Sequence, residues 1–61
     1  MIQILKDATG RKIGEIRSFG TRQELFNDKG QKLGWFDGVN TFDVRGRRIG
    51  SGNLLTTLLR F

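Results

Sequence analysis

A nine-residue pattern occurs three times in this 61-residue chain, and it restricts the possible folds more than any other feature. It reads x-Asp/Asn-x-x-Gly-x-Lys/Arg-Ile/Leu-Gly, and the copies span residues 6–14, 26–34 and 42–50. The Asp or Asn can open a type I turn by accepting hydrogen bonds from backbone amides two or three residues on. The first glycine supplies the left-handed conformation that ends a three-residue hairpin loop. The pattern therefore predicts three β-hairpins, with tips near residues 8–9, 28–29 and 44–45.

The second glycine of each copy, at positions 14, 34 and 50, predicts that the sheet bends. Ile13 and Ile16 are three residues apart, as are Leu33 and Phe36, so an unbroken strand would place the members of each pair on opposite faces. A β-bulge at the intervening glycine would return both to one face and bend the strand. Such corners allow a sheet to curl into a barrel.

The other connections are short, so consecutive strands should pair antiparallel. The expected strands are residues 2–6, 11–17, 22–27, 31–37, 40–43 and 47–50. We therefore predict a mainly β fold, a curled antiparallel meander or shallow barrel of about six short strands in repeated hairpins. The hairpin repeats lie around 4–17, 24–37 and 40–50 in a single domain of residues 1–61.

Residues 53–60 have the only apolar spacing in the chain that suits a helix. The leucines at positions 54, 55, 58 and 59 fall on one stripe of a 3.6-residue helix. We predict a short C-terminal helix packed on or in the sheet. A strand is the alternative, because Thr56 and Thr57 are β-branched, but alternation would expose half of the leucines.

The chain contains no Cys and no His, which excludes disulfides and ordinary zinc sites. A domain of this size usually needs an additional source of stability, and self-association remains available. We expect a homo-oligomer. If the C-terminal segment is helical and only half covered within one chain, its open face and Phe61 are the expected contact. We also expect a cytoplasmic protein, since the lack of Cys fits a reducing compartment, residues 1–5 form no signal-peptide core, and no apolar run approaches the roughly 20 residues of a transmembrane segment.

Catalysis is not expected, because the commonest bases and nucleophiles, His and Cys, are missing. Turn formation explains Asp7, Asp37 and Asp43, and Asp28 lies inside a loop. The remaining candidate acids are Glu15 and Glu24, and carboxylates on strands are far more often solvated or salt-bridged than catalytic. We predict no catalytic residue, no cofactor and no metal site.

The net charge of +5, from 11 Lys and Arg against 6 Asp and Glu, favours an anionic partner and also keeps a small domain soluble. Lys12, Lys32 and Arg48 occupy the same column of the three copies and point away from the core by strand alternation. If the hairpins stand around a pseudo-axis, these side chains form a ring, with Arg11 and Arg47 near the same ends. Such a ring can hold the phosphates of a headgroup or of a nucleic-acid backbone. The alternative is that these charges serve solubility alone.

Trp35 is the only Trp, and Phe36 adjoins it. One of the two should face inward and the other outward, unless the bulge at Gly34 intervenes. An outward aromatic ring beside Lys32 can stack a base or pack against a neighbouring strand or subunit.

The glycine-turn hairpins, followed by the Leu-rich segment at residues 50–59, resemble the small bacterial four-fold beta flower proteins over essentially the whole chain. The resemblance implies a shallow, pseudo-symmetric β-barrel with hairpin petals and no established activity. This chain has three clear turn signatures, so a fourth petal would be degenerate, around Ser18–Thr21, or the symmetry would be lower. The family's shape has been likened to the Tubby-type barrels, whose surface can bind phosphoinositide, and this likeness implies no catalytic residue.

Three functions follow as hypotheses. The first is a non-catalytic, self-associating interaction module that engages an anionic surface, such as lipid headgroups, or an acidic protein through its basic face. The second is a small nucleic-acid-binding β-barrel that uses the basic ring with Trp35 or Phe36. The third is a purely structural subunit of an assembly.

Overall fold

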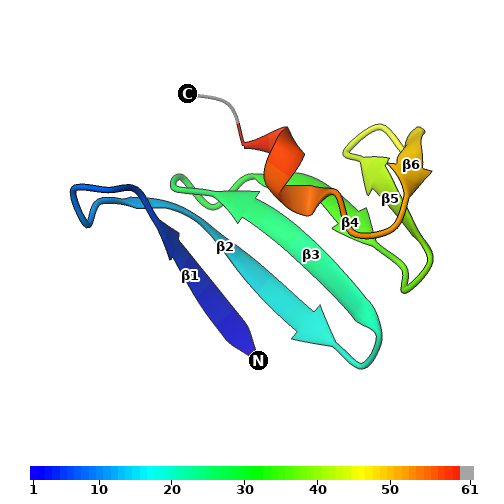
Figure 1. Ribbon diagram of the computed structural model, residues 1–61, viewed down its shortest axis with the longest axis horizontal. Helices are drawn as coiled ribbons and strands as arrows, with labels where there is room; N and C mark the ends of the chain where they lie inside the picture. Colours follow the sequence, from blue (N-terminus) through cyan, green and yellow to red (C-terminus); the bar gives the residue numbers. More distant parts are fainter. Residues whose placement is uncertain (60–61) are drawn as a thin grey trace.

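Six antiparallel strands form one sheet in the computed structural model, which describes residues 1–59 (Figure 1). The strands are β1 (Ile2–Lys6), β2 (Lys12–Phe19), β3 (Arg22–Asn27), β4 (Lys32–Phe36), β5 (Asn40–Asp43) and β6 (Arg48–Ser51). Their order across the sheet is β1-β2-β3-β4-β5-β6, so each neighbouring pair is a hairpin. The mainly β meander is confirmed. The sheet is curled and open, with β1 and β6 as its two edges, and it is not a closed barrel (Figure 1).

The three repeated turns have the predicted geometry. Asp7 Oδ1 accepts hydrogen bonds from the amides of Thr9, at 2.9 Å, and of Arg11, at 3.0 Å. Asn27 and Asp43 make the same pair of contacts, all at 2.9 Å, to the amides two and four residues on. The contact two residues on was expected, whereas the second lies one residue further along than predicted. The glycines that end the turns are Gly10, Gly30 and Gly46, with φ of 85°, 81° and 85°.

A β-bulge follows each turn and bends the sheet. In the β1–β2 pair, Leu5 faces Gly14 but Lys6 faces Lys12, so Ile13 is the extra residue. Leu33 and Ile49 are the equivalent extra residues of β4 and β6. The bulge in β4 has the expected consequence, since Leu33 and Phe36 both pack against the core.

The core lies on the face of the sheet that the C-terminal segment crosses, over β3 and β4 (Figure 1). Its buried members are Ile16 on β2, Leu25 on β3 and Leu55 on the C-terminal segment. The partly buried side chains around them are Leu5, Leu33, Phe36, Leu58 and Leu59. The leucines that follow β6 therefore supply a large share of the apolar contacts that a single sheet cannot make by itself.

The predicted helix over 53–60 is wrong in extent and type. The structure has one turn of 3-10 helix, η1 (Leu55–Leu58), and no α-helix within residues 1–59; residue 60 lies outside the described part. The Thr57 amide and hydroxyl both donate to the Leu54 carbonyl, at 3.0 and 2.6 Å, which closes this single turn. Within residues 1–59, no helix is long and apolar enough to cross a membrane.

Three of the four leucines are spread along the sheet because each of these three sits over a different repeat glycine. A Cβ built on Gly50 would lie 2.6 Å from Leu54 Cδ1, and one on Gly34 would lie 2.6 Å from Leu58 Cδ1. A Cβ on Gly14 would lie 3.2 Å from Leu59 Cδ2. The second glycine of the repeat is therefore a seat for a leucine as well as a bend in a strand. Three separated seats explain why the segment does not wind into a longer helix.

Thr41 fastens the start of this segment to β5. It is fully buried, and its hydroxyl donates to the Gly52 carbonyl at 2.7 Å while accepting a hydrogen bond from the Leu54 amide at 2.9 Å. Both hydrogen-bonding functions of the hydroxyl are thus satisfied, as a buried polar group requires.

Candidate anion-binding face

The face of the sheet that points away from η1, here called the outer face, carries one row of side chains across all six strands. Residues directly opposite each other on paired strands share a face, so the register defines this row. Its members are Ile2, Arg17, Glu24, Trp35, Phe42 and Arg48. A second row, closer to the hairpin tips, contains Ile4, Glu15, Phe26 and Lys32. Charged and aromatic residues predominate in both rows.

Most of the net charge of the protein lies on this face. Its cationic residues are Lys6, Lys12, Arg17, Arg22, Lys32 and Arg48, and its anionic residues are Glu15 and Glu24. Six cations against two carboxylates give a net charge of +4, out of +5 for the whole chain. Among residues 1–59, the four cations and four carboxylates that lie elsewhere cancel. The outer face is therefore the part of the molecule whose field attracts an anion.

Glu15 holds two of these cations in place from the centre of β2. Lys12 Nζ lies 3.0 Å from its Oε1, and Arg17 Nε lies 2.8 Å from its Oε2. The Glu15 residue is 8% exposed, whereas the side chains of Lys12 and Arg17 remain 43% and 44% exposed. The carboxylate is thus covered by its cations, and the cations face solvent.

Glu24 does the same on β3 with a different pair. Its Oε2 accepts from Lys32 Nζ at 2.7 Å and lies 3.2 Å from a terminal nitrogen of Arg22. The two carboxylates therefore orient four cations between them, on three adjacent strands.

Aromatic rings lie against the charged ends of three of these cations. The Arg17 guanidinium lies 4.5 Å from the centre of the Phe26 ring. Arg22 and Lys32 lie 5.5 and 5.1 Å from the centre of the Trp35 ring, which stacks on Phe42 at 5.4 Å with an interplanar angle of 18°. The Trp35 ring is already in contact with two cations and one aromatic ring, so a base would have to displace one of them to stack on it.

The ion pairs lower the pKa of both carboxylates. Hydrogen bonds from Arg17, and then from Lys12, hold the pKa of Glu15 below its ordinary value of 4.5. The hydrogen bond from Lys32 is the main cause of the lowered pKa of Glu24. A carboxylate whose pKa is lower in the folded state than in the unfolded state stabilises the fold above its unfolded pKa, and this stabilisation is lost as the pH falls through the folded value.

We therefore expect the free energy of unfolding to fall as the pH is lowered from 6 to 3, a range that spans the ordinary Glu value of 4.5. Urea unfolding followed by circular dichroism at several pH values measures this dependence. The Glu15→Gln, Glu24→Gln double variant should lose less stability over that range. Part of the loss will remain, because the turn carboxylates Asp7, Asp37 and Asp43 also have lowered pKa values. An identical pH dependence in the two proteins would contradict the assignment.

The predicted basic residues separate into two groups. Lys12, Lys32 and Arg48 lie on the outer face on alternate strands, and they form a line across an open sheet instead of a ring. The Arg47 guanidinium turns back to Asp43, with Nε 3.0 Å from Oδ2, at the third hairpin tip. Arg11 lies at the first hairpin tip, beside a cavity. The structure thus brings together three of the five predicted residues.

The predicted aromatic residues also separate. Trp35 lies on the outer face, whereas Phe36 packs against the core and is not available to a partner there. Phe61 is outside the described residues.

Half of the cations on this face were not predicted from the sequence. Lys6, Arg17 and Arg22 lie outside the repeated columns that drew attention to Lys12, Lys32 and Arg48. Strand alternation could have placed Arg17 on this face, since Glu15 and Arg17 flank the buried Ile16 and neighbours of an inward residue face outward.

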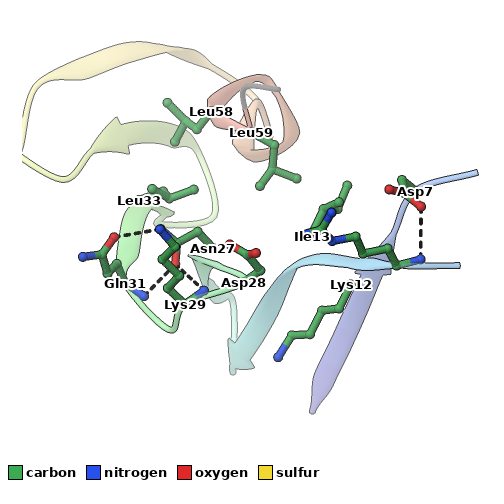
Figure 2. Close-up of a pocket in the computed structure, with 11 residues that line it drawn as sticks. Asp7, Lys12, Ile13, Asn27, Asp28, Lys29, Gln31, Leu33, Leu58 and Leu59 are labelled. Carbon is green, nitrogen blue, oxygen red and sulfur yellow. Dashed lines mark hydrogen bonds between the residues drawn. The ribbon is translucent and has the colours of Figure 1, made fainter. Parts of the chain in front are cut away.

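A cavity of about 550 Å³ lies between the tips of the first two hairpins and the C-terminal segment (Figure 2). Its apolar part consists of Ile13, Leu33, Leu58 and Leu59, and its charged rim consists of Asp7, Asp28, Arg11, Lys12 and Lys29. Two carboxylates largely offset the three cations, one of which, Lys12, is paired with Glu15. The cavity therefore adds little to the attraction for an anion. No group of three or more His, Cys, Asp or Glu suited to a metal ion occurs within the described residues.

Comparison of the chain with protein-family models, with curated proteins and with solved structures found no match.

Proposed function

We propose that the protein is a non-catalytic binding module that engages an anionic surface or an acidic partner through its outer face, in the cytoplasm. The observation that supports this proposal most directly is the segregation of charge, with +4 of the chain's +5 on one face of one sheet. Charges that served solubility alone would not need to gather on one side.

The cations of this face have hydrogen-bond donors that remain available to a partner. Arg17 uses only Nε for Glu15, so its terminal nitrogens remain available, and an ammonium such as that of Lys32 has three donors. Glu15, Glu24 and the aromatic rings restrict the rotamers of these long side chains before a partner arrives. Less conformational entropy is then lost on binding.

The proposal is tested by reversing charge on the outer face and, separately, at the hairpin tips. The Lys12→Glu, Lys32→Glu, Arg48→Glu triple variant and the Arg11→Glu, Lys29→Glu, Arg45→Glu triple variant change the net charge of the chain by the same amount. Each cation near an anionic bilayer contributes about 1 kcal/mol, so loss of three should weaken vesicle binding by roughly 100-fold or more. We expect the outer-face variant to lose far more affinity for phosphatidylserine vesicles, and for an acidic peptide, than the tip variant.

Circular dichroism must first show that both triple variants remain folded. A second outer-face variant with Gln at the same three positions removes the positive charges without adding new carboxylates beside Glu15 and Glu24. Equal losses in the outer-face and tip variants would mean that net charge alone governs binding and would contradict the proposal.

Nucleic-acid binding is the second candidate, because the outer face places cations beside aromatic rings, and a base could stack on Trp35 by displacing a cation such as Lys32 from its ring. A nucleic-acid module should bind single-stranded RNA or DNA with an affinity that falls steeply with salt, and Trp35, the only Trp, reports stacking by its fluorescence. Tighter binding to polynucleotide than to anionic vesicles or acidic peptide, with a change in Trp35 emission, would select this function.

A further inference from the structure

Strand β1 has an unpaired outer edge with a regular set of backbone groups. Met1 and Ser18 exchange hydrogen bonds, with the Ser18 amide 2.8 Å from the Met1 carbonyl and the Met1 amino group 3.3 Å from the Ser18 carbonyl. Hydrogen-bonded and non-hydrogen-bonded pairs alternate along antiparallel strands, so Gln3 and Leu5 bond to β2. The amides and carbonyls of Ile2 and Ile4 consequently point away from β2, toward the open edge.

The same two residues expose apolar side chains. Ile2 is 59% exposed and Ile4 is 46% exposed, both on the outer face. Edge strands are normally protected by Pro, by an internal bulge, by several charges or by a covering element. The stretch from Ile2 to Leu5 pairs with β2 in unbroken register, the chain has no Pro, η1 lies over β3 and β4, and Lys6 is the only charge in the strand.

We propose that β1 pairs with β1 of a second copy of the chain, antiparallel, about a two-fold axis at Gln3. In this register Ile2 lies directly opposite the second copy's Ile4, and both are residues whose backbone groups face the edge. The two Ile pairs then form one apolar cluster on the outer face. Lys6 lies beyond the paired stretch, away from the second copy's Lys6. The next symmetric register, centred on Ile4, would instead place Lys6 opposite an Ile, so the strand favours the axis at Gln3.

The symmetry has a consequence for binding. The two-fold axis of an antiparallel strand pair is perpendicular to the sheet, so the two outer faces lie on the same side of one continuous sheet. A dimer then presents twice the cationic surface to an extended anionic partner, and both halves can bind at once. This consequence depends on the proposed function, whereas the pairing of β1 does not.

A cysteine on the proposed axis tests the register directly. The chain has no Cys, so Gln3→Cys introduces a single thiol at a non-hydrogen-bonded pair, where opposing Cα atoms lie about 4.5 Å apart and a disulfide can form. Val39→Cys, at a position that is 68% exposed and far from β1 in the sheet, is the matched control. We expect air oxidation to cross-link Gln3→Cys at least roughly tenfold faster than Val39→Cys at equal concentration.

Ile4→Pro tests the edge without disturbing the rest of the sheet. The Ile4 amide faces outward, so proline removes a bond to the second copy and none to β2. In sedimentation velocity at tens of micromolar, wild type should be a dimer and Ile4→Pro a monomer with an unchanged circular dichroism spectrum. A monomeric wild type, a dimeric Ile4→Pro, or equal cross-linking of the two cysteine variants would overturn the proposal. The outer-face charge variant should still dimerise, so loss of anion binding alone bears on the function and not on this interface.

Discussion

Leu55→Asp is expected to leave the protein unfolded at 25 °C in the absence of denaturant. Leu55 is fully buried and is the one side chain of the C-terminal segment that belongs to the buried cluster with Ile16 and Leu25. Truncating a buried leucine to alanine already lowers the free energy of unfolding by about 2–5 kcal/mol. A carboxylate at the same place adds the penalty of an unpaired buried charge. A core of this size rarely supplies more than about 3–5 kcal/mol, so the variant has no stability left.

Thr56→Asp is the matched control, because Thr56 is the next residue and its side chain is exposed. It introduces the same charge into the same turn and should remain folded, with a midpoint of urea unfolding close to that of wild type. Circular dichroism and urea titration measure both variants. A folded Leu55→Asp protein with a wild-type spectrum would show that the C-terminal segment is not part of the core.

The hairpins could be predicted from the sequence because their determinants are local. An Asp or Asn side chain, a left-handed glycine and a short loop specify each turn within five residues, and the structure confirms all three tips. The strand order could also be predicted, since short connections between consecutive strands leave antiparallel neighbours as the only arrangement.

The C-terminal segment could not be predicted in the same way, because its conformation depends on contacts distant in sequence. The spacing of its leucines suits a helix, but three of the four sit over glycines from different hairpins, as Leu58 does over the distant Gly34. The contacts of Leu54 with a buried hydroxyl on Thr41 add a constraint that periodicity does not contain. Tertiary packing therefore outweighs the weak helix propensity of a seven- or eight-residue segment.

The residues of the outer face could be predicted only in part, because the cross-strand contacts that complete it join residues distant in sequence. Repeat position identified Lys12, Lys32 and Arg48, and strand alternation placed them correctly on the outside. The repeat carries no information on cross-strand neighbours, so the sharing of Glu24 by Arg22 and Lys32 emerges only from the register.

Gly34→Ala is expected to destabilise the protein by about 3 kcal/mol, at the upper end of the usual range for an overpacked core. The φ of Gly34 is not in the left-handed region, so backbone strain does not contribute. The reason is space: a new Cβ would contact the Phe42 carbonyl oxygen and would lie 2.6 Å from Leu58 Cδ1. The carbonyl belongs to the backbone of the adjacent strand β5 and cannot move without disturbing the β4–β5 pairing.

Gly50→Ala is the comparison that separates these two contacts. A Cβ there would meet only Leu54 Cδ1, at 2.6 Å, which is the end of a flexible side chain. We expect Gly50→Ala to lower the free energy of unfolding by about 1 kcal/mol, because Leu54 can adjust its rotamer. Urea unfolding of the two single variants should rank Gly34→Ala as clearly the more destabilised.

Double variants then distinguish a contact with a side chain from a contact with the backbone. In a Leu54→Ala background, Gly50→Ala should cause little further loss of stability, because the atom that it would meet has been removed. In a Leu58→Ala background, Gly34→Ala should still be destabilising, since the Phe42 carbonyl remains. Full rescue of Gly34→Ala by Leu58→Ala would mean that this glycine serves only to seat a leucine. The expected partial rescue means that Gly34 also lets β4 approach β5 at the bend. The absence of a Cβ at position 34 is then needed both for the curvature of the sheet and for the packing of the C-terminal segment on it.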